Sequence, residues 1–143
     1  PNGFNVPFGH YKTVPTIVTK EHLLEVQELI KDVKFINSDF SDSIETAIEN
    51  DFVYLDPPYA PEMKTSFVGY TKDGFSIEQH ELLFQLIKDL SKKNIKFTMS
   101  NSNVKLIQTN FPKTEYTVDE IICRRAINSK NPESTAKEVF ICN

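Results

Sequence analysis

Residues 52–61 read FVYLDPPYAP, and the fold prediction starts from them. A short apolar run that ends in turn-forming residues is typical of a strand buried on both faces in a parallel sheet. Proline lacks a backbone N–H, fixes its own φ and pushes the preceding residue toward extended geometry. We therefore predict a buried strand over 52–56, ended by Pro57 and Pro58. A plain turn would explain the Asp-Pro-Pro segment, but not the aromatic ring of Tyr59 that follows it.

Helical and strand-like segments alternate on both sides of this stretch. Thr19 is expected to cap a helix over 20–32, and Ser76 and Gln79 to form a capping box at the start of a helix over 76–93. The second helix has the apolar stripe Leu82, Leu83, Leu86, Ile87 and Leu90. Further predicted elements are strands over 33–37, 95–102, 114–124 and 137–143, the last two antiparallel, and a short helix over 104–111. This alternation predicts an α/β fold.

Polar residues follow three of the predicted strands. They lie in the segments 37–40 (NSDF), 56–59 (DPPY) and 100–102 (SNS). In α/β sheets, ligands bind beyond the carboxyl ends of the strands. We therefore expect these three segments to lie along one rim of the sheet and to form a site there.

The DPPY segment can bind an amino group. A proline carbonyl is an acceptor with no N–H beside it, and the Asp56 carboxylate supplies a second acceptor. Two rigid acceptors a few ångströms apart suit the two hydrogens of an exocyclic –NH2 group, and Tyr59 offers a flat face on which a planar base can stack. An amine held in this way turns its lone pair toward an electrophile in front of it. The segment therefore predicts alkylation of an aromatic or amide amine.

Length and composition narrow the classes of protein to which this chain can belong. The 143 residues, 39% hydrophobic and 25% charged, are typical of one globular domain. The formal net charge of -4 argues against a basic surface over the whole protein, although a local basic face is enough to bind nucleic acid. Cys123 and Cys142 lie apart with no histidine nearby, so we expect neither a disulfide framework nor a metal site. No membrane-spanning stretch or signal peptide is found, so a cytoplasmic, intracellular protein without a membrane partner is expected.

Several motifs resemble one enzyme family. DPPY resembles the catalytic motif (D/N/S)PP(Y/F) of amino-methyltransferases. Five further segments resemble those of Dam-type (D12 class) DNA adenine-N6 methyltransferases: FNVPFGHYK (4–12), NSDF (37–40), FVGYTKDGFSIEQHELL (67–83), MSNS (99–102) and RRAINS (124–129). The match corresponds to the C-terminal portion of that family and spans essentially the whole chain. It implies a Rossmann-like class I S-adenosylmethionine-dependent methyltransferase fold, with a mostly parallel sheet and an antiparallel C-terminal strand.

The resemblance implies roles for individual residues. The DPPY residues Asp56, Pro57, Pro58 and Tyr59 would be catalytic: the acid and the first proline carbonyl receive the adenine amine, and the tyrosine stacks on the base. The target adenine would have to be flipped out of the duplex. S-adenosylmethionine would be the methyl donor, bound by Asp39, Phe40 and Asp56, and no metal would be required.

The resemblance also implies contacts to double-stranded DNA. Residues 1–17 would be a remnant of the target-recognition hairpin, and 18–143 the C-terminal half of the catalytic domain. The candidate DNA-binding residues are Asn5, Pro7, His10, Tyr11, Lys12, Arg124 and Arg125. Histidine at position 10, where the family often has arginine, alters any contact made there. Many relatives recognise GATC, which suggests the same site here, and restriction-modification is among the biological roles implied.

One element of the family pattern is not found in this sequence. The family holds the methionine part of the donor with a Gly-rich turn, FxGxG, and none of the four glycines forms one. The family's sheet has the strand order 3-2-1-4-5-7-6, and the strands predicted here would be the third to the seventh. We therefore expect N-terminal strands to be missing, and an N-terminal half, in the same longer chain or in a complementing chain, to be a partner.

Other interpretations stay open. A non-catalytic remnant that binds DNA or a partner would suit the absence of the Gly-rich turn. A methyltransferase acting on a protein glutamine amide would use a similar clamp, although FNVPFGHYK belongs to the DNA-adenine branch. Cytosine-N4 enzymes more often carry serine in place of Asp56. A structural role is the alternative for Phe40 and the favoured role for Phe75 and His80.

Overall fold

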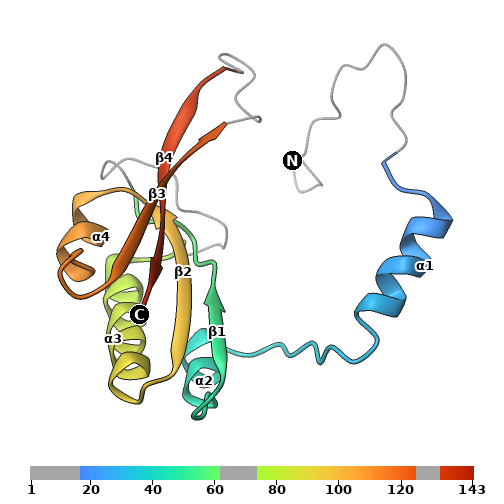
Figure 1. Ribbon diagram of the computed structural model, residues 1–143, viewed down its shortest axis with the longest axis horizontal. Coiled ribbons are helices and arrows are strands. Elements are labelled where there is room, and N and C mark those ends of the chain that lie inside the picture. The colour runs from blue at the N-terminus through green and yellow to red at the C-terminus, as the bar shows by residue number, and fades with distance from the viewer. Residues whose placement is uncertain (1–16, 62–73, 125–132) are drawn as a thin grey trace. The chain divides into compact units, whose positions relative to one another are not determined.

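The computed structural model describes residues 17–61, 74–124 and 133–143. Contacts divide the chain into two units, Pro1–Asn37 and Ser38–Asn143, which are described separately. The second unit contains the sheet and three helices (Figure 1). None of the helices in the described ranges is long and apolar enough to cross a membrane.

The first unit contains helix α1 (Lys20–Leu29). Thr19 caps it as predicted, since its hydroxyl accepts a hydrogen bond from the backbone N–H of His22 at 3.2 Å. The strand predicted over 33–37 is not formed, and that prediction is wrong. A strand needs a neighbour to satisfy its backbone groups, and none of the described residues pairs with this segment.

The second unit is built on a four-stranded sheet. Its strands are β1 (Phe52–Leu55), β2 (Lys96–Ser102), β3 (Thr117–Arg124) and β4 (Thr135–Cys142), in the order β1-β2-β4-β3. This order agrees with that of the fourth to seventh strands in the predicted arrangement. Only the β1–β2 pairing is parallel, whereas β4 is antiparallel to both β2 and β3. The described sheet is therefore mixed and not mostly parallel, because the C-terminal hairpin contributes both antiparallel pairings and residues 33–37 contribute none.

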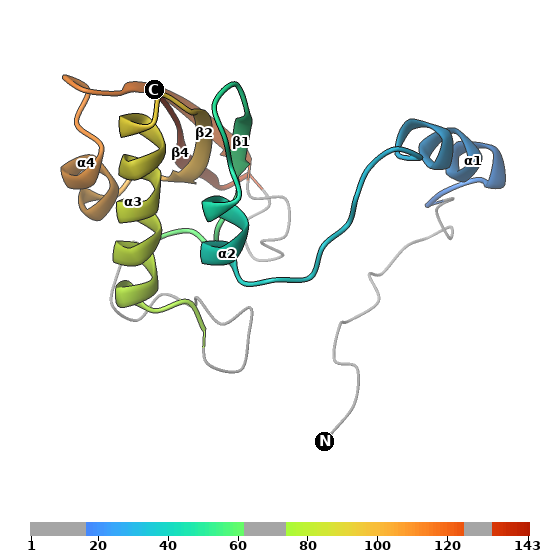
Figure 2. The same cartoon turned by 90° about the horizontal axis from the view of Figure 1, so that it is seen from below.

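Helices cover the core side of this sheet. Helix α3 (Ile77–Lys92) packs on β2, helix α2 (Phe40–Glu45) lies beside α3, and the short helix α4 (Lys105–Asn110) follows β2 (Figures 1 and 2). The capping box predicted for α3 is confirmed. The buried face of α3 consists of His80, Leu83, Phe84, Ile87 and Leu90. Leu82, which we assigned to the apolar stripe, is instead 48% exposed.

Strand β1 is buried on one face. Val53 and Leu55 pack against the core, whereas Phe52 is 64% exposed and Tyr54 58% exposed. The prediction of a strand buried on both faces is therefore wrong for the described residues. The physical reason is that β1 is the outer strand of the described sheet and helices pack only on the side of Val53 and Leu55.

Two substitutions in α3 test this account of the core. Ile87 is 0% exposed, so Ile87→Ala is expected to lower the free energy of unfolding by about 2–5 kcal/mol, since it removes buried methyl groups and leaves a cavity. Leu82→Ala on the same helix serves as the matched control and should cost less than about 1 kcal/mol, because half of that side chain is already in water. Chemical denaturation measures both values, and equal losses would contradict the assignment of the buried face.

Candidate active site

The loop that follows β1 meets the end of β2. The parallel register aligns Leu55 with Met99, which brings Asp56 beside Ser100. The Ser100 hydroxyl donates to Asp56 Oδ1 at 2.5 Å and lies 3.3 Å from the Leu55 carbonyl oxygen. Of the three segments expected at one rim of the sheet, DPPY and SNS meet as predicted. NSDF (37–40) does not follow a strand, since none forms over 33–37. The hydroxyl fixes one oxygen of a carboxylate whose residue is otherwise exposed.

The side chain of Asn101 holds the loop farther along. It is fully buried, and its Oδ1 accepts hydrogen bonds from the backbone N–H groups of Ala60 at 2.8 Å and Ser102 at 2.9 Å. The Ser102 hydroxyl donates to the Ala60 carbonyl at 2.5 Å. Both backbone polar groups of Ala60 are thus bound by the end of β2. The Asn101 Nδ2 atom has no hydrogen-bond partner among the described residues.

His80, on α3, holds the same loop from the other side. Its ring is fully buried, with Nε2 3.1 Å from the Pro58 carbonyl oxygen and Nδ1 2.9 Å from the Ser76 carbonyl oxygen. Phe75 packs edge-on against the ring, with 4.7 Å between centroids. The structural role predicted for His80 is therefore confirmed in part, since the ring is a buried core group. The sequence did not show that this group touches the DPPY segment.

Two acceptors of the loop have no donor within residues 17–61, 74–124 and 133–143. Among the described residues, none donates a hydrogen bond to Asp56 Oδ2 or to the Pro57 carbonyl oxygen. By contrast, Asp56 Oδ1, the Pro58 carbonyl and both polar backbone groups of Ala60 are all in contact with β2 or α3. The loop is thus bound on its inner side and presents one carboxylate oxygen and one carbonyl oxygen for a ligand. These are the two acceptors that an amine requires.

Tyr59 lies half-buried beside these acceptors. Its hydroxyl donates a long hydrogen bond of 3.4 Å to Glu138 Oε2 on β4. Burial raises the pKa of Tyr59 above its ordinary value, and the negative charges of Glu138 and Asp56 add to this, while the nearby Ser100 hydroxyl opposes it. The phenol is therefore kept neutral to a higher pH than usual. Sequence reasoning missed Glu138, and a single acid within the apolar strand 135–142 was the signal that could have found it.

Asp39 and Phe40 lie at the start of α2. Asp39 is the N-cap, and its Oδ1 accepts from the Ser41 N–H at 2.9 Å and from the Ser41 hydroxyl at 2.7 Å. These bonds, the backbone one foremost, lower the pKa of the Asp39 carboxyl. The Phe40 ring packs against Phe75 at 5.7 Å, and Phe75 in turn contacts His80. A row of rings thus leads from Phe40 to the DPPY loop, and it confirms the prediction that Phe75 serves packing. Donor binding by Asp39 and Phe40 stays a prediction.

Of the candidate DNA-binding residues, the structure describes Arg124 alone. It is exposed at the end of β3, where its guanidinium pairs with Glu133. Strand β4 pairs with β3 from Thr135 onward but with β2 only from Glu138 onward, so the β3–β4 hairpin continues past the end of β2 (Figure 1). Arg124 therefore lies on the side of the sheet where the DPPY loop lies. Asn5, Pro7, His10, Tyr11, Lys12 and Arg125 are outside the described residues.

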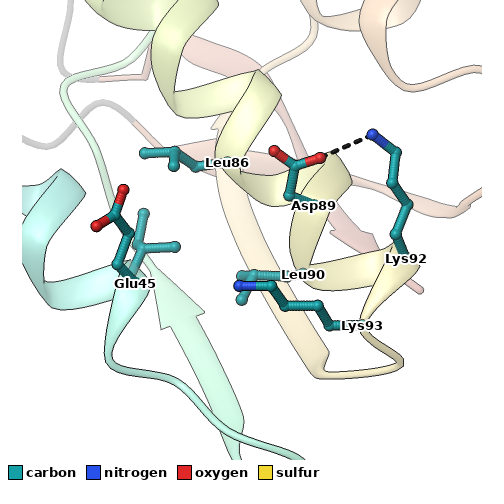
Figure 3. A pocket seen from close by; sticks show the side chains of 7 residues that line it. Glu45, Leu86, Asp89, Leu90, Lys92 and Lys93 are labelled. Atoms are coloured by element: carbon teal, nitrogen blue, oxygen red, sulfur yellow. Dashed lines mark hydrogen bonds and ion pairs between the residues drawn. The ribbon is translucent and has the colours of Figure 1, made fainter.

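A hollow of about 400 Å³ between α2 and α3 is separate from this loop. Figure 3 shows Glu45 of α2 across from Leu86 and Asp89 of α3, with Asp89 paired to Lys92 at 2.7 Å. These α3 residues lie toward the C-terminal end of the helix, whereas the loop contacts its first turn through His80. The hollow is therefore not part of the candidate active site.

Comparison with known proteins identifies the family. Residues 1–125 match the model of the D12 class N6 adenine-specific DNA methyltransferases. The chain belongs to this family.

Individual relatives of this D12 class chain agree with that result. The Type II methyltransferase M1.LlaDCHI of Lactococcus lactis subsp. cremoris is 35% identical over 146 aligned residues, which cover 99% of this chain and 50% of the relative. The Type II methyltransferase M.MjaIII of Methanocaldococcus jannaschii is 36% identical over 89% of this chain and 44% of the relative. The DNA adenine methylase of Haemophilus influenzae is 33% identical over 95% of this chain and 46% of the relative. The chain spans about half the length of these curated relatives.

Removing the Asn101 side chain tests its role in holding the loop that follows β1. Asn101→Ala would leave the N–H groups of Ala60 and Ser102 unsatisfied in a buried place, so the free energy of unfolding should fall by about 2 kcal/mol or more. Asn103→Ala is the matched control: Asn103 accepts from the Gln108 side chain at the surface, and its loss should cost less than about 0.5 kcal/mol. Denaturant titration of both variants measures the difference, and similar costs would refute the bridging role.

The pKa of Tyr59 tests its surroundings. Glu138→Gln is expected to lower this pKa toward its ordinary value, because a negative charge is removed, while burial keeps part of the elevation. Ultraviolet titration of the phenolate, as the difference between each protein and its Tyr59→Phe counterpart, measures the shift. Glu120→Gln, whose carboxylate pairs with Lys113, is the control and should leave the value unchanged.

The same pKa has a consequence for stability. The pKa of Tyr59 is higher in the folded state than in the unfolded state. The contribution of Tyr59 to the free energy of unfolding is therefore fully present below the pKa of the unfolded phenol and is lost as pH rises through the pKa of the folded state. The free energy of unfolding, taken relative to that of Tyr59→Phe, should therefore decline as pH rises through this alkaline range. A difference between the two proteins that stays constant across that range would contradict the raised pKa.

Proposed function

We propose that this chain supplies the amine-binding loop of an S-adenosylmethionine-dependent DNA adenine-N6 methyltransferase. The observation that carries the proposal is that Asp56 Oδ2 and the Pro57 carbonyl oxygen have no donor among the described residues, while Asp56 Oδ1, the Pro58 carbonyl and the backbone of Ala60 are bound from within. Such a pair suits the two hydrogens of an exocyclic amine. The clamp alone would also suit other planar amines, and membership of the D12 class favours adenine.

Each residue of the loop has a distinct task in this mechanism. Asp56 Oδ2 and the Pro57 carbonyl oxygen accept hydrogen bonds from the two N–H groups of the amine, which orients the nitrogen lone pair away from the loop. Ser100 fixes the Asp56 carboxylate through Oδ1, so that Oδ2 stays directed at the amine. Tyr59, tethered to Glu138, stacks on the base. Because none of these groups can reach an amine inside a duplex, the target adenine has to be flipped out.

The surroundings of the residues proposed to bind the methyl donor agree in part with that role. S-adenosylmethionine would supply a methyl group on a positively charged sulfur, which is already an electrophile. Asp39 is exposed and uses Oδ1 for capping, and among the described residues none donates a hydrogen bond to its Oδ2. Phe40 is half-buried against Phe75, so it can offer part of its ring to the donor. We therefore keep Asp39 and Phe40 as donor-binding candidates, next to Asp56.

The DNA would lie along the rim that carries the loop. Arg124 at the end of the β3–β4 hairpin lies on this side and can exchange Glu133 for a phosphate. His10, Tyr11 and Lys12, in the segment that resembles the recognition hairpin, are proposed to contact the target sequence. Two of the relatives, from Haemophilus influenzae and Escherichia coli, are named DNA adenine methylases, which supports adenine as the target. GATC, which only the motif resemblance suggests, is the first sequence to test.

A methylation assay tests the proposal. The chain, and a chimera in which the upstream half of the Haemophilus influenzae relative precedes it, are incubated with S-adenosylmethionine and mixed-sequence duplex DNA. The digested DNA is then analysed for N6-methyladenine by mass spectrometry. Asp56→Ala is expected to lower the yield by about 100-fold or more, because one of two acceptors aimed at the reacting amine is lost.

Asp89→Ala is the matched control for this assay. Its carboxylate pairs with Lys92 in the C-terminal part of α3, so its removal should leave the yield unchanged. Methylcytosine in place of methyladenine, no product from either protein, or product that survives Asp56→Ala would each contradict the proposal.

A further inference from the structure

In the proposed mechanism His80 has no task, although its ring contacts the Pro58 carbonyl oxygen. Both ring nitrogens of His80 lie within hydrogen-bond distance of backbone carbonyl oxygens, those of Ser76 and Pro58. Carbonyls accept only, so each neutral tautomer of the imidazole donates to one of them and the protonated ring donates to both. The ring is fully buried among Phe75 and Phe84, with no exposure to water. In either neutral tautomer one of these contacts is a hydrogen bond that the ring donates, and this bond stabilises a polar ring in such a place.

The Pro58 carbonyl also has no other described donor. Pro57 and Pro58 carry no N–H, so neither residue can be held through a backbone donor of its own. The neighbouring anchors are Ser100 on Asp56, before the two prolines, and Asn101 with Ser102 on Ala60, after them. Between these anchors, His80 makes the one hydrogen bond found for the proline pair among the described residues.

The orientation of one proline carbonyl constrains the next. The φ angles of both prolines are fixed near a single value. When the Pro58 carbonyl points inward to His80, the Pro57 carbonyl therefore has few possible orientations. The Pro57 oxygen is the acceptor that the proposed function assigns to the amine. A loss of the His80 contact would therefore let this acceptor move, and the loop, including the Asn101 contact with Ala60, would open more often.

We propose that His80 is a positioning residue: its Nε2–H donates to the Pro58 carbonyl and thereby fixes the Pro57 carbonyl in the amine-accepting direction. This inference rests on the proposed function for the task of the Pro57 carbonyl. The His80–Pro58 contact itself is independent of that function. His80 does not touch the base or the donor, and its effect passes through the proline pair.

Two variants of the full 143-residue chain separate positioning from packing. His80→Phe keeps a planar ring but removes both donors, whereas His80→Gln keeps an N–H that can reach the Pro58 carbonyl. Hydrogen exchange at the Ala60 amide, which donates to Asn101, reports the loop directly, with the β2 amides as an internal control for folding. We expect exchange at the Ala60 amide to rise about tenfold in His80→Phe and to stay within about threefold in His80→Gln, since only the local opening of the loop changes.

Kinetics of the active protein add a second readout. His80→Phe is expected to lower kcat for adenine methylation by about 10–100-fold with little change in KM for DNA, because a misplaced acceptor affects the reacting geometry more than binding. His80→Gln should recover most of that loss. Equal kcat losses in both variants would assign His80 to packing alone and overturn the inference.

A measurement on the unaltered chain does not depend on how the variants fold. Nitrogen-15 NMR of the His80 imidazole should show a slowly exchanging proton on Nε2, and an unprotonated Nε2 would overturn the inference. Unchanged exchange at the Ala60 amide in His80→Phe would overturn it as well. These two readouts require no methylation, so they stand if the Asp56 test fails, and the failure of one proposal can be told from the failure of the other.

Discussion

The buried side chain of Asn101 connects the sheet to the loop that carries the proposed chemistry. Its Oδ1 binds the N–H groups of Ala60, in the loop, and of Ser102, in its own strand. An unsatisfied buried N–H costs about 1–3 kcal/mol, so this one oxygen has a large share in holding the loop closed. The place of Asp56, Pro57 and Tyr59 relative to β2 follows from this bridge and from the Ser100 hydroxyl.

The loop is fixed on one side and available on the other. Strand β2 and helix α3 bind the polar groups that point inward, through Ser100, Asn101, Ser102 and His80. Preorganised acceptors of this kind need no rearrangement when a ligand arrives, which is the condition under which electrostatic contacts contribute most to catalysis. In the sheet order β1-β2-β4-β3, strand β4 lies directly beside β2. This neighbour relation brings Glu138 of β4 next to Tyr59.

Local signals in the sequence predicted much of this arrangement. The capping pair of Ser76 and Gln79 set the start of α3, and the turn chemistry of Pro57 ended β1, because both effects act within a few residues. The strand over 33–37 was predicted from its apolar residues, but pairing requires a neighbour that the described chain does not provide.

Contacts between distant segments were not visible in the sequence. Glu138 lies 79 residues from Tyr59, and His80 lies 22 residues from Pro58, so neither contact has a local pattern. Their partners are set by strand order and by the rotation of α3 about its axis, which depend on packing of the whole unit. The polar run SNS predicted a site at the end of β2, but not which atom each side chain would bind.

The central claim is that Asp56 Oδ2 and the Pro57 carbonyl oxygen together receive the amine of a flipped adenine. The most direct measurement is a crystal structure of the protein with a short duplex that contains the preferred site, together with S-adenosylhomocysteine. The account predicts the adenine N6 atom at roughly 3 Å from both oxygens, with the base against Tyr59. An amine bound elsewhere, or a Pro57 carbonyl turned inward to a protein donor, would contradict it.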